Sequence, residues 1–388
     1  MAEESTYTVG LLPVGALSVA LFHHLTNGGL STEGVCFLAR SGSNGAARVA
    51  EGGGIHIEIG GQVQTLPTAL QRGDLLAAAK AGELTDIVVV CTNPDQIFGV
   101  LNDYLQLLQW EYEQGRMLPG SARLPVLVLS SNGIYFQRVR RTLIELAEEA
   151  TLLGRLPDLW PDAMPLLVGR LLRGVTMQTG LRRGSGTKAV YRPGPRGRTV
   201  MAGGSREIRA EVTRALAARG GWYEDAGTIT PTQAEFNKAL VNLSSNLLGQ
   251  LIAIDAAGSF RALTVGEVTA PPHQARIREL VNAVVKVGQA LKVYPTNHDA
   301  ENAFEEVMQL NRAASSHVPS SLQWIEAQLA AGAPLPTMTP TETWLLQPLQ
   351  HYARSIGDEG LIHYFEMLEI ELKTALGRAA TKGIPREP

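Results

Sequence analysis

The 388-residue sequence has few cysteines, little excess charge and no long hydrophobic run. Its two cysteines, Cys36 and Cys91, each lie in a short apolar run, which excludes a disulfide framework or a cysteine metal site. The net charge of −3 argues against a nucleic-acid or membrane partner. No apolar run approaches the ~18 residues of a membrane span, and the acidic N-terminus lacks the pattern of a secretory signal. We therefore expect a cytoplasmic protein with a small-molecule partner.

Two further chemistries find no support in the sequence. Only eight histidines are present. His23 and His24 are adjacent and so point apart, and the other six are scattered, so no metal is expected. No serine or cysteine nucleophile motif is present either.

The first forty residues have the pattern of a βαβ unit. Tyr7–Leu12 is typical of a buried strand, Pro13–Ser18 of a tight turn into a helix, and the cluster 27–29 (Asn-Gly-Gly) of a helix stop. Val35–Ala39 is again apolar and strand-like. Strand, turn, helix and strand in this order predict a Rossmann-type domain.

The turn after the first strand is the expected pyrophosphate site, because a helix N-terminus offers free N–H groups and a positive dipole end. Of the G-x-G-x-x-G fingerprint only Gly15 is present, and Pro13 and Ser18 occupy the other two glycine positions. The residues expected to hold the cofactor at this turn are Val14, Gly15, Ala16 and Leu17.

Arg40 ends the second strand and is followed by a polar loop. An acid at this position suits the ribose of NAD, whereas an Arg suits the 2′-phosphate of NADP. NADPH is therefore the expected cofactor. The alternative is a solvated Arg in a polar loop.

Two more buried strands are predicted at Ile87–Thr92 and Pro125–Ser130. Ligands bind at the carboxyl ends of parallel strands, so Thr92, Asn93 and Asn132 are expected to reach the cofactor. An Asn before a Gly is also a common turn, which is the alternative for Asn132.

The remaining part of the first domain contains less regular patterns. We expect a hairpin over 55–66, an inserted helical segment at about 134–173, and a second hairpin pairing Thr187–Arg192 with Arg198–Ala202. The stretch 182–198 carries six basic residues and no acid. A solvated edge that discourages strand pairing is the favoured interpretation, and an anion-binding or partner-facing edge is the alternative.

After Thr230 the patterns are helical. Thr230 and Gln233 have the form of a capping box, with Pro231 at the first helical position. Lys238, Asn242 and Asn246 recur every four residues and so share one face. A solvated stripe and a cleft explain this face about equally well.

Helical periodicity continues at 272–291, 300–314, 320–331, 341–355 and 360–376. The expected fold is thus an α/β Rossmann-type domain followed by an all-α domain. We expect the NADP-binding domain at 6–228, the helical substrate and dimerisation domain at 229–378, and a flexible tail at 379–388.

These residues resemble the ketopantoate reductase family of NADPH-dependent 2-oxo acid reductases. The similarity rests on the helix face with Lys238, Asn242 and Asn246, and on Arg40. It also includes Asn132-Gly133, the motif 319–323 (PSSLQ), and the Thr-Glu pair at 341–342. The sequence departs from the family at the glycine turn, at Asn93 in place of a Lys, and at Trp324 in place of an Asp.

The resemblance implies roles for individual residues. Lys238 would be the proton donor, Glu342 a partner of a substrate hydroxyl, and Asn132 part of the catalytic and cofactor-binding sets. Asn242, Asn246 and Ser320 would bind the substrate. A homodimer is expected by the same analogy.

Three functions remain open from the sequence. The first is an NADPH-dependent reductase of a 2-oxo acid or related carbonyl compound. The second is a non-catalytic binding or regulatory protein whose altered turn, with Pro13 and Ser18, no longer holds a cofactor. The third is an NADP-dependent imine or opine-type reductase whose pocket differs at Asn93 and after Ser320.

Overall fold

The computed structural model describes residues 7–27, 34–118, 120–184 and 186–383. Contacts along the chain separate it into two compact units, and each is described by itself below. Unit 1 comprises Met1–Ser131 and Phe136–Pro231, and unit 2 comprises Asn132–Tyr135 and Thr232–Pro388. The glycines at 28 and 29, expected to stop the first helix, lie outside the described residues.

The centre of unit 1 is an eight-stranded sheet in the order β12-β11-β8-β7-β6-β1-β2-β5. All neighbours are parallel except β8 and β11. The central strands are continuous apolar runs because both of their faces are covered. The strands are β1 (Val9–Leu12), β2 (Val35–Leu38), β5 (Gln71–Arg72), β6 (Ile87–Val90), β7 (Val126–Leu129), β8 (Leu171–Thr176), β11 (Arg198–Gly203) and β12 (Trp222–Asp225).

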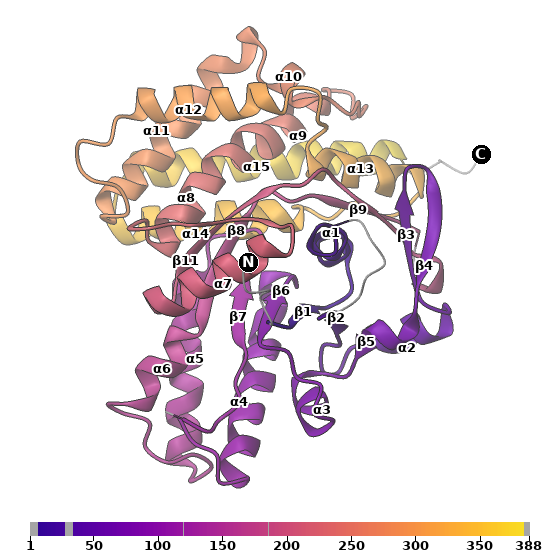
Figure 1. Cartoon of the computed structure of the whole chain (residues 1–388). Coiled ribbons are helices and arrows are strands. Elements are labelled where there is room, and N and C mark those ends of the chain that lie inside the picture. Colours follow the sequence, from indigo (N-terminus) through magenta and orange to yellow (C-terminus); the bar gives the residue numbers. More distant parts are fainter. Residues whose placement is uncertain (1–6, 28–33, 119, 185, 384–388) are drawn as a thin grey trace. The chain divides into compact units, whose positions relative to one another are not determined.

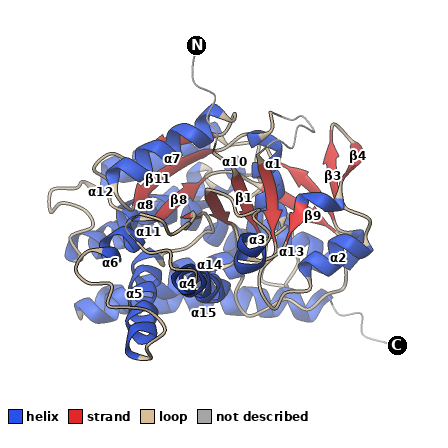
Figure 2. Cartoon of the chain, turned by 60° about the horizontal axis from the view of Figure 1, so that its bottom comes forward, coloured by secondary structure: helices blue, strands red, loops and turns tan. Residues whose placement is uncertain are grey.

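Helices cover both faces of this sheet. In Figure 2, α1 and α7 lie on one side of the strands, and α4 and α5 lie on the other. Val19, Phe22, Val212 and Leu216 join α1 and α7 to the core on their side. The helical elements of unit 1 are α1 (Ala16–Leu25), α2 (Gly45–Glu51), η1 (Thr68–Leu70), α3 (Leu75–Lys80), η2 (Pro94–Gln96), α4 (Ile97–Glu113), α5 (Phe136–Leu152), α6 (Ala163–Gly169), η3 (Gly186–Lys188) and α7 (Arg206–Ala218).

A second, four-stranded sheet has the order β4-β3-β10-β9. Its strands are β3 (Ile55–Ile59), β4 (Gln62–Leu66), β9 (Gly180–Arg183) and β10 (Val190–Pro193). The predicted hairpin over 55–66 is confirmed, and Gly60 and Gly61 take the positive φ angles of 58° and 81° that its two-residue turn requires.

The predicted hairpin of 187–192 with 198–202 is wrong. β10 pairs with β3 and β9 in the small sheet, whereas β11 pairs with β8 and β12 in the large one. The Pro-Gly-Pro stretch between them therefore carries the chain from one sheet to the other, instead of turning it back. Sequence spacing alone does not distinguish these two connections.

The segment predicted as largely helical over 134–173 is helical only in part. α5 and α6 occupy most of it, but Leu171–Thr176 forms β8, which is buried along its whole length. A short apolar run has no clear period, so a buried strand here is not separable from a helix end by pattern alone.

Unit 2 is helical. Its elements are α8 (Pro231–Asn242), η4 (Leu243–Leu247), α9 (Leu248–Ala253), α10 (Val265–Val268), η5 (Pro271–His273), α11 (Gln274–Ala290), α12 (Ala300–Ala313), α13 (Ser320–Ala330), α14 (Pro340–Ile356) and α15 (Glu359–Gly383). Figure 1 shows α11, α12, α14 and α15 as the long helices of this unit. The tail expected at 379–388 is helical up to Gly383.

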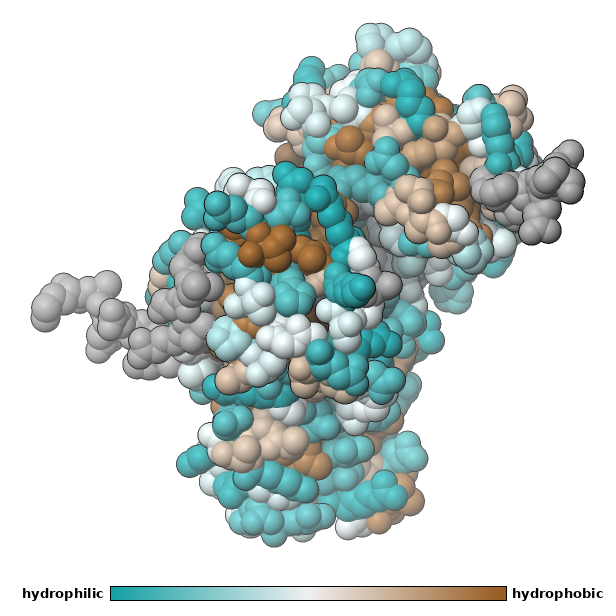
Figure 3. Space-filling model, turned by 90° about the vertical axis from the view of Figure 1, so that its right-hand side faces the viewer, coloured by the Kyte–Doolittle hydropathy of each residue, from teal (hydrophilic) through white to brown (hydrophobic). Residues whose placement is uncertain are grey.

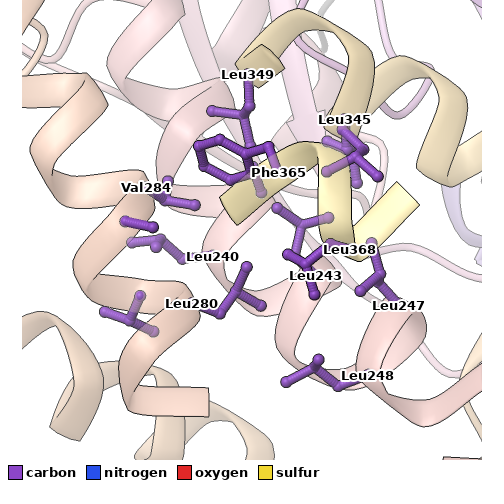
Figure 4. Packing of buried hydrophobic residues seen from close by; sticks show 14 of the residues in the cluster. Leu240, Leu243, Leu247, Leu248, Leu280, Val284, Leu345, Leu349, Phe365 and Leu368 are labelled. Atoms are coloured by element: carbon purple, nitrogen blue, oxygen red, sulfur yellow. The ribbon is translucent and has the colours of Figure 1, made fainter. Parts of the chain in front are cut away.

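The core of unit 2 surrounds the chain from Leu240 to Leu248. Figure 4 shows leucines of this stretch packed against α11, α14 and α15. The labelled side chains are all 5% exposed or less: Leu240, Leu243, Leu247, Leu248, Leu280, Val284, Leu345, Leu349, Phe365 and Leu368. Among the helices in the described residues, none combines the length and apolar character needed to cross a bilayer.

The helix predicted from Thr230 to Leu251 begins at Pro231 as expected, but it is not a continuous α-helix. Its middle, η4, is a π-helix. The hydroxyls of Ser244 and Ser245 both donate to the Val241 carbonyl, at 2.9 Å each. Serine hydroxyls that compete for a helix carbonyl disturb the regular ladder, and π segments are frequent at functional sites.

Candidate functional site

In unit 1 the sheet changes direction between β1 and β6. The chain runs from β1 to β2 on one side, while β6 and β7 lie on the other. Leu12 at the end of β1 is in register with Val90 at the end of β6, and the Cys91 N–H donates to the Leu12 carbonyl at 2.6 Å. The turn after β1 and the loop after β6 are therefore neighbours at the switch point, where open α/β sheets bind ligands.

The turn after β1 keeps only part of its anion-binding capacity. Gly15 precedes the first residue of α1, and its N–H donates to the Ser18 hydroxyl at 2.8 Å. The same hydroxyl lies 3.0 Å from the Gly15 carbonyl, which accepts from it. One donor of the turn is therefore occupied by Ser18, and the amides of the first turn of α1 remain for a ligand.

Gly15 leaves space above the turn. Its φ of −171° is extended backbone that any residue can adopt, so glycine is not needed for conformation. A Cβ at Gly15 would meet nothing closer than 3.9 Å and would project into open space. An open position beside a helix N-terminus fits the diphosphate of a dinucleotide.

Arg40 lies in the loop after β2, where Asp103 of α4 reaches toward it. Asp103 is only 7% exposed, and the Ser41 N–H approaches its carboxylate at 3.4 Å. Burial raises the pKa of Asp103 to about 6, Asp74 adds to this, and Ser41 and the Arg40 charge oppose it. The positive charge of Arg40 is thus partly offset by a carboxylate that the sequence pattern did not reveal.

The loop after β6 supplies Thr92 and Asn93. Thr92 is buried, and its hydroxyl donates to the Gln96 side chain at 2.6 Å. Asn93 is exposed at the start of η2. Asn93 is therefore the side chain of this pair that is exposed at the switch point, and Thr92 shapes the loop.

The loop after β7 is held by a buried arginine. Arg173 of β8 is 2% exposed and donates to the carbonyls of Leu129 and Ser131 at 2.6 and 2.8 Å. It fixes the chain just before Asn132. This role is not evident from the sequence pattern, because Arg173 lies at the end of a predicted helical segment.

In unit 2 the segment 132–135 packs against α8 and α14. The Ile134 N–H donates to the Trp344 carbonyl at 2.9 Å, and the Tyr135 N–H donates to the Glu235 carboxylate at 3.2 Å. A Cβ at Gly133 would lie 2.9 Å from the Trp344 Cβ. The elements that carry Asn132, Lys238 and Glu342 are thus neighbours within this unit.

The polar face of α8 is not a solvated stripe. Asn242 and Asn246 are only 7% and 6% exposed, and Lys238 is half-buried. His317, in the loop before α13, lies near enough to Lys238 to be affected by it. Burial, and then the Lys238 charge, lower the pKa of His317, which favours the neutral imidazole.

Asn246 joins the π-helix to the start of α13. Its side-chain oxygen accepts from the Ser321 N–H at 3.1 Å, the Ser321 hydroxyl at 2.8 Å and the Ser320 hydroxyl at 3.3 Å. Asn246 therefore caps the N-terminus of α13 from a different segment of the chain. Asn246 and Ser320, both expected to bind substrate, are brought together, and Ser320 itself is exposed.

Glu342, in the first turn of α14, has no exposed surface. Neither carboxyl oxygen makes a hydrogen bond of normal geometry, and the nearby Gln250 oxygen and Thr339 hydroxyl are also buried without partners. Burial raises the pKa of Glu342 to about 7, although the nearby Gln250 and Ser321 oppose this. Gln250 and Ser321 are close to the carboxylate but do not hydrogen-bond it.

The predicted site residues thus form two groups, one in each unit. Unit 1 holds the turn at 14–17, Arg40, Thr92 and Asn93, and unit 2 holds Asn132, Lys238, Asn242, Asn246, Ser320 and Glu342. Four further residues of these regions were not predicted from the sequence: Asp103, Arg173, His317 and Ser321. Only Ser321 lies within a motif quoted above, 319–323. In the described ranges no group of three His, Cys, Asp or Glu side chains is arranged to hold a metal ion.

Comparisons with known proteins agree with this fold. Neither protein-family models nor characterised proteins match the sequence. Among solved structures, D-mandelate dehydrogenase with NADH and anilino(oxo)acetate matches with a TM-score of 0.64 and 14% identity, covering 95% of this chain and 99% of that one. A ketopantoate reductase from Ralstonia eutropha matches with a TM-score of 0.59 and 15% identity, covering 96% and 99%.

A dimeric ketopantoate reductase from Staphylococcus aureus gives a TM-score of 0.58 at 12% identity, with 96% and 99% coverage. The chain therefore has the fold of these reductases along nearly its whole length. The predicted fold class, a Rossmann-type domain followed by a helical domain, is confirmed. The resemblance to ketopantoate reductases is confirmed at the level of the fold.

Proposed function

We propose that the protein is a nicotinamide-dependent reductase of a 2-oxo acid or a closely related carbonyl compound, with NADPH as its cofactor. The observation that carries the proposal is the half-buried Lys238 beside two buried asparagines, on a helix interrupted by a π segment. The dehydrogenase and reductases of the same fold support it, because the dehydrogenase is bound to NADH and anilino(oxo)acetate.

The switch point of unit 1 fits a dinucleotide. The open space at Gly15 and the first-turn amides of α1 would hold the diphosphate. Arg40 would lie toward the adenosine end, where its guanidinium suits a 2′-phosphate. The bound cofactor would supply the hydride.

Lys238 would act on the substrate carbonyl. Reduction places negative charge on the carbonyl oxygen, and a positioned ammonium stabilises this charge and then gives the oxygen its proton. The lowered pKa of His317 keeps that neighbour neutral, so it does not add a second positive charge beside the ammonium. The products are the 2-hydroxy acid and the oxidised cofactor.

The carboxylate of the substrate requires hydrogen-bond donors. The Ser320 hydroxyl and the Asn242 amide are the donors we assign, together with Asn132. Asn246 contributes by holding Ser320 and the first turn of α13 in place. Glu342, which lies close to Ser321, is the residue we assign to a substrate hydroxyl, and in its protonated form it does not repel the anion.

The test combines binding with turnover. Thermal unfolding is measured with NADPH, with NADH and without cofactor, because a ligand that binds only the folded state raises its stability. A larger upward shift with NADPH than with NADH is expected, followed by NADPH oxidation with some members of a panel of 2-oxo acids. No shift with either cofactor at millimolar concentration would contradict the proposal and favour the non-catalytic alternative, in which Ser18 blocks the turn.

A further inference from the structure

Unit 1 contains a cavity of about 90 Å³ that opens between α2 and the small sheet. Its apolar wall includes Val49, Ile55 and Ala189, all buried. Arg48 and Arg182 also line the cavity, and both are exposed. Two cations therefore stand at the mouth of a small, partly apolar cavity.

The register of the small sheet places Arg182 on the same face as two buried residues. Arg182 is paired directly with Tyr191, and Tyr191 with Ile57, so the three side chains share one face. Ile57 is only 1% exposed, which identifies this face as the one that packs inside the unit. Arg182 lies at one edge of this face and the exposed Gln64 at the other, with the buried Tyr191 and Ile57 between them.

The neighbouring Arg183 provides the contrast. It points to the opposite face and forms an ion pair with Glu58 at 3.3 Å. Arg182 and Arg48 form no ion pair within the part of the chain that the structure describes. Tyr191 is buried and lines the same cavity, and its pKa is raised by burial and lowered by the charges of Arg182 and Arg48.

The cavity has the size and rigidity for a small anion. The volume of about 90 Å³ exceeds the space that one water molecule needs, so the cavity accommodates a phosphate group. Next to Thr187, which lines the cavity, the backbone is closely packed, because a Cβ at Gly52 would lie 2.9 Å from the Thr187 carbonyl. Figure 3 shows that the side of the molecule with β3 and β4 is mainly hydrophilic, with hydrophobic residues in small separate patches.

Val14 connects the cavity to the cofactor turn, because it lines the cavity and belongs to the turn after β1. We propose that Arg48, Arg182 and Tyr191 form a phosphate-binding site that recognises a phosphomonoester. The phosphate comes either from the 2′-position of a dinucleotide held at the Val14 turn, in place of the Arg40 contact proposed above, or from a separate phosphorylated ligand. Only the first source depends on the proposed function.

The experiment uses the full chain and three single variants at constant ionic strength. Arg48→Gln and Arg182→Gln each remove one cavity cation, and Arg183→Gln is the control on the opposite face of the same strand. Dissociation constants are measured for inorganic phosphate, NADPH and NADH. Because hydrogen bonds to charged groups are lost, phosphate binding should weaken roughly ten-fold or more in the two cavity variants and stay unchanged in the control.

The nucleotide measurements separate the two sources. If the site holds the 2′-phosphate, the preference for NADPH over NADH falls in both cavity variants, and phosphate competes with NADPH but not with NADH. If it holds a separate ligand, the preference is unchanged and phosphate binds together with NADPH.

Phosphate and NADPH affinities equal to wild type in both cavity variants, or an equal loss in Arg183→Gln, would overturn the inference. A different result would show that the proposed function is wrong. In that case no nicotinamide nucleotide binds, while phosphate binding that depends on Arg182 persists and still supports the phosphate site.

Discussion

Glu342 places an ionisable carboxyl group where nothing bonds it. Its folded pKa of about 7 lies above the ordinary value of 4.5. Between these values the folded protein holds a proton that the unfolded chain releases, so the free energy of unfolding decreases as pH rises from about 4.5 to 7. Above pH 7 the buried carboxylate is charged and the loss is complete.

The variant Glu342→Gln lacks this titration and keeps the shape of the neutral acid. We expect it to match wild type near pH 4 and to be more stable by about 3 kcal/mol at pH 8, a value that follows from the size of the pKa shift. Urea unfolding of both proteins from pH 4 to 8 measures the difference. A constant difference across this range would show that Glu342 titrates normally.

Substitution of Lys238 tests its proposed role as the proton donor. Lys238→Ala should lower turnover roughly 10²- to 10⁴-fold, because a positioned general acid contributes that much, and should leave cofactor affinity unchanged. Lys286→Ala, an exposed lysine on α11, is the matched control and should behave as wild type. Steady-state kinetics and cofactor titration measure both effects. Undiminished turnover in Lys238→Ala would remove this residue from the mechanism.

Two variants of Asn246 distinguish a structural role of this residue from a role in substrate binding. Asn246→Ala removes the acceptor for three donors of α13 and should cost about 1–2 kcal/mol in unfolding free energy. Asn246→Asp keeps the acceptor and places a negative charge near a helix N-terminus, so it should be close to wild type in stability. If substrate contacts the amide, Asn246→Asp raises KM for an anionic substrate while unfolding is unchanged. Equal instability of the two variants would contradict the cap.

At the scale of elements, β9 is held closely against α1. A Cβ at Gly180 would lie 2.1 Å from the Ala16 carbonyl, at the beginning of the helix that would bind the diphosphate. Gly180→Ala must therefore displace β9 or α1, and we expect a loss of stability of about 1–3 kcal/mol together with weaker cofactor binding.

The control for this variant is Gly99→Ala. Gly99 lies within α4 with no atom within 4 Å of its added Cβ, so alanine should stabilise by about 0.5–1 kcal/mol. Chemical denaturation and cofactor titration of both variants give the comparison. If Gly180→Ala unfolds at the same denaturant concentration as wild type, the contact with α1 is looser than the structure indicates.

The elements with strong local signals were predictable from the sequence. The βαβ pattern, the Gly-Gly hairpin and the start of α8 at Pro231 are specified by short-range chemistry. The elements that were predicted wrongly depend on pairing with strands distant in the sequence. β10 and β11 are separated by a turn-like stretch, yet they enter different sheets, because β10 pairs with β3 and β11 pairs with β8.

The candidate site was predictable in part for the same reason. The Lys238 face follows from helical spacing, but its burial depends on the packing of unit 2, which spacing does not encode. Asp103 lies in an otherwise apolar helix and His317 in a loop without a motif. Their roles depend on neighbours distant in the sequence, the Arg40 loop for Asp103 and Lys238 for His317. The π-helix arises from two serine hydroxyls on one carbonyl, a competition that periodicity does not reveal.

For the whole molecule, the two units carry different parts of the proposed chemistry, and neither is formed from one continuous segment. The residues 132–135 that pack in unit 2 interrupt unit 1, so the chain leaves unit 1 and returns before that unit is complete. Cutting the chain between the two units cannot therefore give two intact halves. Binding and turnover must be measured on the full chain.

The small sheet also dictates an order of events during synthesis. β3 pairs in parallel with β10, joining Ile57 to Tyr191, which lie about 130 residues apart in the chain. Until β10 leaves the ribosome, β3 and β4 exist only as a two-stranded ribbon, which is marginally stable in water. β3 and β4 can therefore pair with β10 only after most of unit 1 has been translated, so the small sheet is completed late in folding.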